Sequence, residues 1–135
     1  MKKETKHARV LSARQVRSFA QKTLITGMFP DSFDLEEFSR GRPSLIRNLP
    51  LWVGRYGLIT GDGQYLFWSE PIESPKDTFP SQAVIDVPRG RYMIDTLDTA
   101  SSRWVSRESA EGGPLVIGLA YTGHPVLLWI HTRID

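Results

Sequence analysis

The second half of the chain alternates between apolar and polar positions with the two-residue period of β-strands. After Pro88 and Gly90, Tyr92 and Ile94 fall on one face of the predicted strand. Met93, Asp95 and Leu97 fall on the other. Turn residues such as those at 61–63 interrupt these runs at short intervals, which is typical of antiparallel hairpins. The pattern predicts seven strands, at 51–60, 64–70, 82–87, within 88–98, and at 103–107, 115–119 and 126–132.

We therefore predict a mainly β protein, an antiparallel β-sandwich of about seven strands with an N-terminal α-helical extension. The sandwich would be immunoglobulin-like or jelly-roll-like. It would span residues 51–135, after a basic tail, an amphipathic helix and a connector in residues 1–50. The expected core consists of strand positions with large apolar side chains, namely Leu58, Leu66, Ile85, Tyr92, Ile94, Leu115, Ile117, Leu128 and Ile130.

Helical periodicity occurs in the first 50 residues. Ser12 and Gln15 have the spacing of a capping box, and Gly27 is a plausible stop, which predicts a helix at about 12–26. Asp34 begins a shorter helical turn ending near Gly41, and two prolines then favour an extended linker at 42–50. The predicted helix has a narrow apolar stripe, made of Val16, Phe19, Ala20 and Leu24.

The last predicted strand carries apolar side chains on both faces, with Leu128 on one and Trp129 on the other. A strand with one face open to water alternates more cleanly. We expect the second face to be covered by the N-terminal helix, by residues 28–40 or by a partner subunit. Because the helix stripe is narrow, we predict a homodimer with Trp129 or the helix near its interface.

Positive charge is concentrated at the N-terminus. The chain has a net charge of +2, but residues 1–25 hold seven Lys or Arg and one acid, giving +6. The remaining 10 basic and 14 acidic residues give −4. The basic segment either docks on its own acidic domain or binds an anionic partner such as nucleic acid. In the second case the contacting residues would be Lys2, Lys3, Lys6, Arg9, Arg14 and Arg17.

The sequence contains no catalytic motif. Cysteine is absent, no Gly-x-Ser-x-Gly elbow occurs, and His7, His124 and His131 lack metal-ligand spacing. We expect a non-catalytic protein with no metal and no cofactor. The remaining polar candidates are expected in turns or facing solvent, and these are His124, Asp86, Asp95 and Asp98.

The N-terminal residues are charged and lead into no apolar segment, so no signal peptide is expected. The longest apolar run, at 125–130, is too short to cross a bilayer. We therefore expect a cytoplasmic protein without a transmembrane segment.

Aromatic residues on the predicted strands suggest a ligand surface. Most should belong to the core, but an exposed aromatic ring beside a carboxylate or amide can also bind a sugar. Gln64, Trp68 and Glu70 share strand parity, which places them in one row. With Trp52 and Tyr56 on the neighbouring strand, they form the candidate carbohydrate-binding surface.

Part of the chain resembles the C-terminal β-sandwich accessory domains of bacterial glycoside hydrolases. Those domains show a Pro-x-Gly-x-Tyr-x-Val strand, matched here by Pro88, Gly90 and Tyr92, and a closing apolar strand. Leu97–Ser101 departs from their proline- and glycine-containing turn. The resemblance covers about 50 of the 135 residues, in the stretches Ala83–Asp98, Trp104, Gly113–Ile117 and Pro125–Ile130. It implies a non-catalytic binding or accessory protein that is associated with carbohydrate.

Overall fold

The computed structural model describes residues 8–23, 33–72 and 81–132 of the chain. Strands take up 56% of these residues, which confirms the predicted mainly β class. The described residues form one α-helix, α1 (Ala13–Thr23), and two 3-10 helices, η1 (Leu35–Glu37) and η2 (Pro43–Leu45). The strands are β1 (Arg9–Val10), β2 (Arg40–Gly41), β3 (Ile46–Arg47), β4 (Val53–Thr60), β5 (Tyr65–Pro71), β6 (Gln82–Asp98), β7 (Arg103–Gly118) and β8 (Val126–His131).

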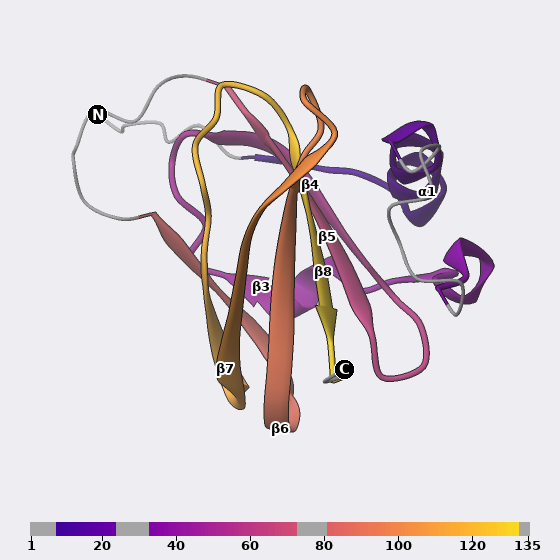
Figure 1. Ribbon diagram of the computed structural model, residues 1–135, viewed down its shortest axis with the longest axis vertical. Helices are drawn as coiled ribbons and strands as arrows, with labels where there is room; N and C mark the ends of the chain where they lie inside the picture. Colours follow the sequence, from indigo (N-terminus) through magenta and orange to yellow (C-terminus); the bar gives the residue numbers. More distant parts are fainter. Residues whose placement is uncertain (1–7, 24–32, 73–80, 133–135) are drawn as a thin grey trace, which may run out of the picture.

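All eight strands belong to one sheet that does not close into a barrel. The strand order is β1-β4-β5-β8-β6-β3, with β2 also on β4 and β7 also on β6. Among the described strands, only β1 and β4 pair in parallel. The predicted strands at 82–87 and 88–98 are one strand, β6, and those at 103–107 and 115–119 are one strand, β7. These two form the long hairpin visible in Figure 1.

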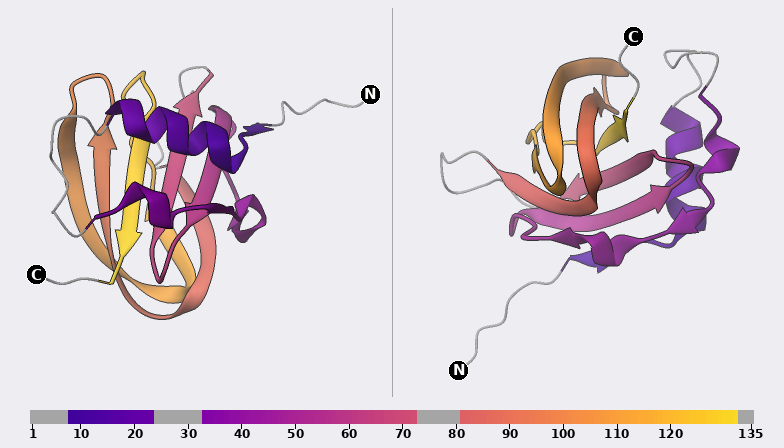
Figure 2. Two further views of the ribbon diagram at one scale, coloured as in Figure 1. Left: turned by 90° about the vertical axis from the view of Figure 1, so that its right-hand side faces the viewer. Right: turned by 90° about the horizontal axis from the view of Figure 1, so that it is seen from below.

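The β6–β7 hairpin contributes to both layers of the sandwich (Figure 2, right). Its ladder is interrupted between Val87 and Arg91, opposite Gly113, and Gly90 and Gly113 both have positive φ angles. On one side of the interruption β6 pairs with β3, and on the other side it pairs with β8. The bend therefore folds one continuous sheet into two facing layers.

The inner core fills the space between these layers. It joins residues of the first half of β6, such as Ile85, to residues of β5 and β8, such as Phe67 and Leu128. All nine predicted core residues are buried, and eight of them lie in the inner core. The ninth, Leu66, belongs to a second cluster on the other face of the sheet.

This second cluster, the outer core, is covered by α1 and the segment at 33–38 (Figure 2, left). Val16 and Ala20 of α1 are fully buried, and the Phe19 ring lies 5.3 Å from that of Trp68. Phe33 packs edge-on against Trp129, which is 4% exposed. The homodimer stays a prediction, but the apolar face on which it was based is covered within the chain.

The start of α1 follows from its sequence. The backbone N–H of Gln15 donates to Ser12 Oγ (3.1 Å), and that of Ser12 donates to Gln15 Oε1 (2.9 Å), which confirms the capping box. The helix comes close to β4 at Gly57, where a Cβ atom would collide with Val16 Cγ2. Leu24 and the predicted stop at Gly27 lie outside the described residues.

Two details of the N-terminal half differ from the prediction. The short helical turn that Asp34 begins, by accepting a hydrogen bond from the N–H of Glu36, ends at Glu37 rather than near Gly41. The expected linker at 42–50 contains η2 and β3. Two-residue strands carry too few positions to show a period, so neither pattern nor propensity revealed β1, β2 and β3.

The approach of α1 to β4 can be tested by a double-mutant cycle. Gly57→Ala should lower the free energy of unfolding by about 1–3 kcal/mol, because the added methyl group overpacks the site. In a Val16→Ala background, where the colliding methyl group is absent, the same substitution should cost less than half as much. Urea denaturation of the four proteins measures both values, and equal costs in the two backgrounds would show that α1 does not pack on Gly57.

Candidate functional site

The predicted carbohydrate-binding surface is not formed, because its residues lie on opposite faces of the sheet. Tyr56 pairs with Ser69, and Trp68 pairs with Gly57, so the Tyr56 and Trp68 side chains point in opposite directions. Trp52 is 5% exposed in the inner core, and Trp68 is 5% exposed in the outer core. Neither indole ring is available to stack on a sugar.

The polar groups expected to take sugar hydroxyls are bonded within the chain. Arg55 donates two hydrogen bonds to the Glu70 carboxylate (2.7 and 3.0 Å), and the Trp68 indole N–H donates a third (2.8 Å). The amide oxygen of Gln64 accepts a hydrogen bond from Trp129 Nε1 (2.8 Å). Gln64, Trp68 and Glu70 lie on one face of the sheet, as predicted. That face packs in the outer core and does not face solvent as a ligand surface.

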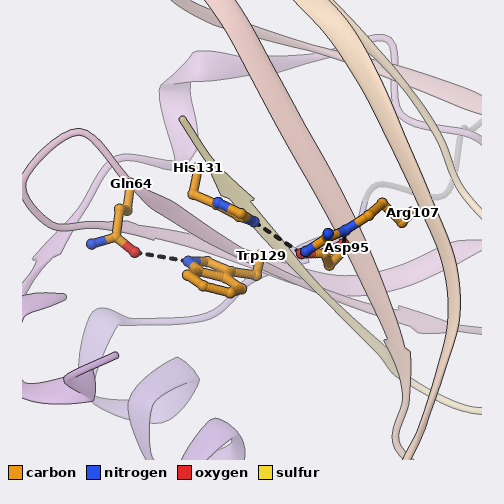
Figure 3. A network of polar contacts seen from close by, with 5 residues as sticks. All are labelled: Gln64, Asp95, Arg107, Trp129 and His131. Carbon is orange, nitrogen blue, oxygen red and sulfur yellow. Dashed lines mark hydrogen bonds and ion pairs between the residues drawn. The ribbon is translucent and has the colours of Figure 1, made fainter. Parts of the chain in front are cut away.

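A polar network lies beside the outer core and joins three strands (Figure 3). Arg107 of β7 donates two hydrogen bonds to Asp95 of β6, at 2.6 and 3.0 Å. His131 Nε2 of β8 lies 2.9 Å from Asp95 Oδ2, and because an ionised carboxylate only accepts, this nitrogen is the donor. The His131 ring is stacked on Trp129 with the centroids 3.8 Å apart.

Asp95 is 5% exposed, so the prediction that it faces solvent was wrong. Burial alone would raise its pKa, but the hydrogen bonds from Arg107 and His131 outweigh burial and hold the pKa below its usual value. Sequence reasoning missed this network because its members are 12 and 36 residues apart from Asp95. Only the pairing of β6 with both β7 and β8 brings them together.

The network has the chemistry of a structural clamp. Its imidazole is 2% exposed and covered on one face by Trp129, which leaves no approach for a substrate. One carboxylate holds two cationic or donor groups from the neighbouring strands, which fixes the relative positions of β7, β6 and β8. The Arg107 guanidinium is the exposed end of the clamp.

The other polar candidates lie at the surface, as predicted. His124 is exposed, and its backbone N–H donates to Thr122 Oγ1. Asp98 begins a turn and accepts a hydrogen bond from Ser101 Oγ (2.8 Å). Asp86 forms a partly exposed ion pair with Arg47. His7 lies outside the described residues.

A group of arginines, the basic surface, gathers where β1, α1 and β2 meet the edge of β4. It consists of Arg9, Arg14, Arg17, Arg40 and Arg42. Arg9 pairs with Arg55, Arg40 pairs with Thr60, and the Arg42 N–H donates to the carbonyl oxygen of Leu58 (2.9 Å). The turn into α1 lies against β2, because a Cβ on Gly41 would lie 3.4 Å from that of Ala13.

The basic surface is not neutralised by described carboxylates. The ion pairs of the described residues use Arg47, Arg55, Arg91 and Arg107 and none of the five arginines of the basic surface. Residues 8–23 contain no acid. Arg9, Arg14 and Arg17 were predicted members, and Lys2, Lys3 and Lys6 lie outside the described residues. Arg40 and Arg42 were missed, because only the pairing of β2 with β4 places them beside the N-terminal segment.

The Asp95 clamp predicts a dependence of stability on pH. The pKa of Asp95 is lower in the folded chain than the value of about 3.9 expected for the unfolded chain. Its stabilising contribution is therefore complete above the unfolded pKa and is lost as the pH falls through the folded pKa. Asp95→Asn should lower the free energy of unfolding by about 1–3 kcal/mol at neutral pH, because it removes hydrogen bonds to a charged group while the exposed Arg107 guanidinium stays solvated.

Urea denaturation between about pH 7 and pH 3 measures this contribution, because the variant lacks the carboxylate that titrates there. The difference between wild type and Asp95→Asn should shrink as the pH falls. Asp86→Asn is the matched control, since its ion pair is solvent-exposed and should matter little. A constant difference between wild type and Asp95→Asn over this range would contradict a charged clamp.

Within the described part of the chain, no helix is long and apolar enough to cross a membrane. Comparisons of the chain with protein-family models, with curated proteins and with solved structures find no match. The resemblance of residues 83–130 to accessory domains of glycoside hydrolases stays a prediction. The function therefore has to be inferred from the residues of the chain itself.

Proposed function

We propose that this is a non-catalytic binding protein that contacts an anionic partner through its basic surface. The observation that supports the proposal is how α1 docks on the sheet. The buried residues of this contact are apolar, with Leu11, Val16 and Ala20 in the outer core. None of the ion pairs among the described residues involves Arg14 or Arg17. The arginines are therefore not needed for the docking of their own segment.

This observation supports the second of the two hypotheses for the basic segment. Docking on an acidic domain requires carboxylates opposite the arginines, and such pairs are absent from the described residues. The described acids closest to Arg40 along the chain are Glu36 and Glu37 of η1, and neither forms an ion pair among the described residues. Unpaired arginines instead keep their full charge and all donors for a ligand.

The positions of the arginines favour binding. Arg9 and Arg40 are in strands paired with β4, and Arg14 and Arg17 are in a helix with a buried face. Because the backbone at each position is held by hydrogen bonds, a ligand has only side chains to order, which lowers the entropic cost of association. A carbohydrate-associated role, implied by the resemblance, stays a prediction without a described site.

Binding of heparin, a polymeric anion, tests the proposal. Arg40→Glu/Arg42→Glu should bind heparin at least about tenfold more weakly than wild type, because each arginine beside an anionic surface contributes about 1 kcal/mol. Isothermal titration at low salt measures the affinity. Arg40 and Arg42 are both exposed, so we expect little effect of their replacement on stability.

Arg89→Glu/Arg103→Glu is the matched control for this experiment. Both residues are exposed and form no ion pair among the described residues, and the change in net charge is the same. The control should bind heparin nearly as well as wild type. Equal weakening by the two double variants would show that net charge, and not the basic surface, determines binding. No binding by wild type would refute the proposal.

A further inference from the structure

We infer that the anionic partner is a double-stranded nucleic acid, held through the phosphates on the two sides of one groove. This inference rests on the proposed function and adds the class of partner. It is carried by the distribution of the arginines over the two faces of one sheet edge. In-register neighbours in a sheet point to the same face, so the pairing of β1 and β2 with β4 assigns each arginine a side.

Arg9 pairs with Arg55, whose guanidinium lies over the Phe19 ring of α1, so Arg9 is on the outer side of the edge. Arg40 pairs with Thr60, which is two residues from Leu58 of the inner core and therefore points to the same side. Arg40 is thus on the inner side of the edge. Arg42 is two residues from Arg40 and therefore lies on the same inner side. The sheet edge thus carries arginines on both sides, and Arg14 and Arg17 belong to α1, which packs on the outer side.

Two rows of arginines separated by the thickness of a sheet edge match a duplex better than a single strand. A duplex groove has a row of phosphates on each side, whereas a single strand has one row. Arginine donates two parallel hydrogen bonds to a phosphate, which suits this contact. The edge of β4, with β1 and β2 on it, would face the groove. The arginines on its two sides would contact the phosphates on the two sides of the groove.

The aromatic side chains of the described residues also disfavour a single strand. Binding to single strands uses successive exposed rings on which bases stack. Phe19 packs against Trp68 beneath Arg55, and Tyr56 packs against the inner core. Tyr121 is exposed at 40%, but it contacts Trp52 in the inner core and does not belong to a row of rings.

A membrane and an acidic protein fit the basic surface less well. A helix that binds a membrane inserts a free apolar face, and the apolar face of α1 is already buried on the sheet. A protein interface has an apolar centre within its polar rim. Val10 is the one exposed large hydrophobic residue in β1, α1 or β2, and a single side chain does not form such a centre.

Fluorescence anisotropy with four probes tests the inference. The probes are a DNA duplex of about 20 base pairs, or two helical turns, one of its strands, polyglutamate and phosphatidylserine vesicles. The duplex should bind most tightly. If five arginines each neutralise one phosphate, its affinity should fall about 500-fold between 50 and 200 mM salt. For Arg40→Gln/Arg42→Gln, with three contacts left, the fall should be only about 40-fold.

Arg89→Gln/Arg103→Gln should retain the salt dependence of wild type. Tighter or equal binding of the single strand, polyglutamate or the vesicles would overturn the duplex inference and leave the proposed function intact. An unchanged salt dependence in Arg40→Gln/Arg42→Gln would overturn it as well, since the inner row would then not touch phosphate. Failure of all four probes to bind would overturn both the inference and the proposed function.

Discussion

The fold depends on the bend in the β6–β7 hairpin, because this bend turns one sheet into two layers. At the bend the Tyr92 hydroxyl donates a hydrogen bond to the carbonyl of Pro88 (2.8 Å), which closes a tight loop of backbone. A Cβ on Gly112 would collide with both Pro88 and the Tyr92 ring, so only glycine fits there. Without the bend, Ile85 and Leu128 would not face each other, and the inner core would not form.

Once the sheet is bent, its outer face needs a cover of its own. The strands β5 and β8 are central and place large side chains on both faces, so folding the inner layer leaves Trp68 and Trp129 uncovered. Phe19 of α1 and Phe33 pack against these two rings. Among the described residues, α1 and Phe33 therefore complete the outer core, and the position of the arginines of α1 is a consequence of this packing.

The sequence was sufficient for the β class, the positions of the longer strands and the capping of α1, because these depend on local periodicity. It was insufficient for the join at Pro88, since a proline and a glycine that end a strand in one context bend it in another. The sequence also could not show which element packs against each face of a strand. The parity of Trp68 and Glu70 was correct, yet whether that parity faced water or α1 depended on contacts distant in sequence. The Asp95 clamp and the placement of Arg40 depended on strand pairing for the same reason.

The charged residues of the described chain fall into two groups with different physical roles. Asp95 is buried, and a buried carboxylate without partners would cost several kcal/mol, so its bonds to Arg107 and His131 offset that cost. Arg40 and Arg42 are exposed, so solvent already compensates their charge and folding gains nothing from them. Selection for stability gives no reason to gather such charges at one sheet edge, whereas binding to an anion does.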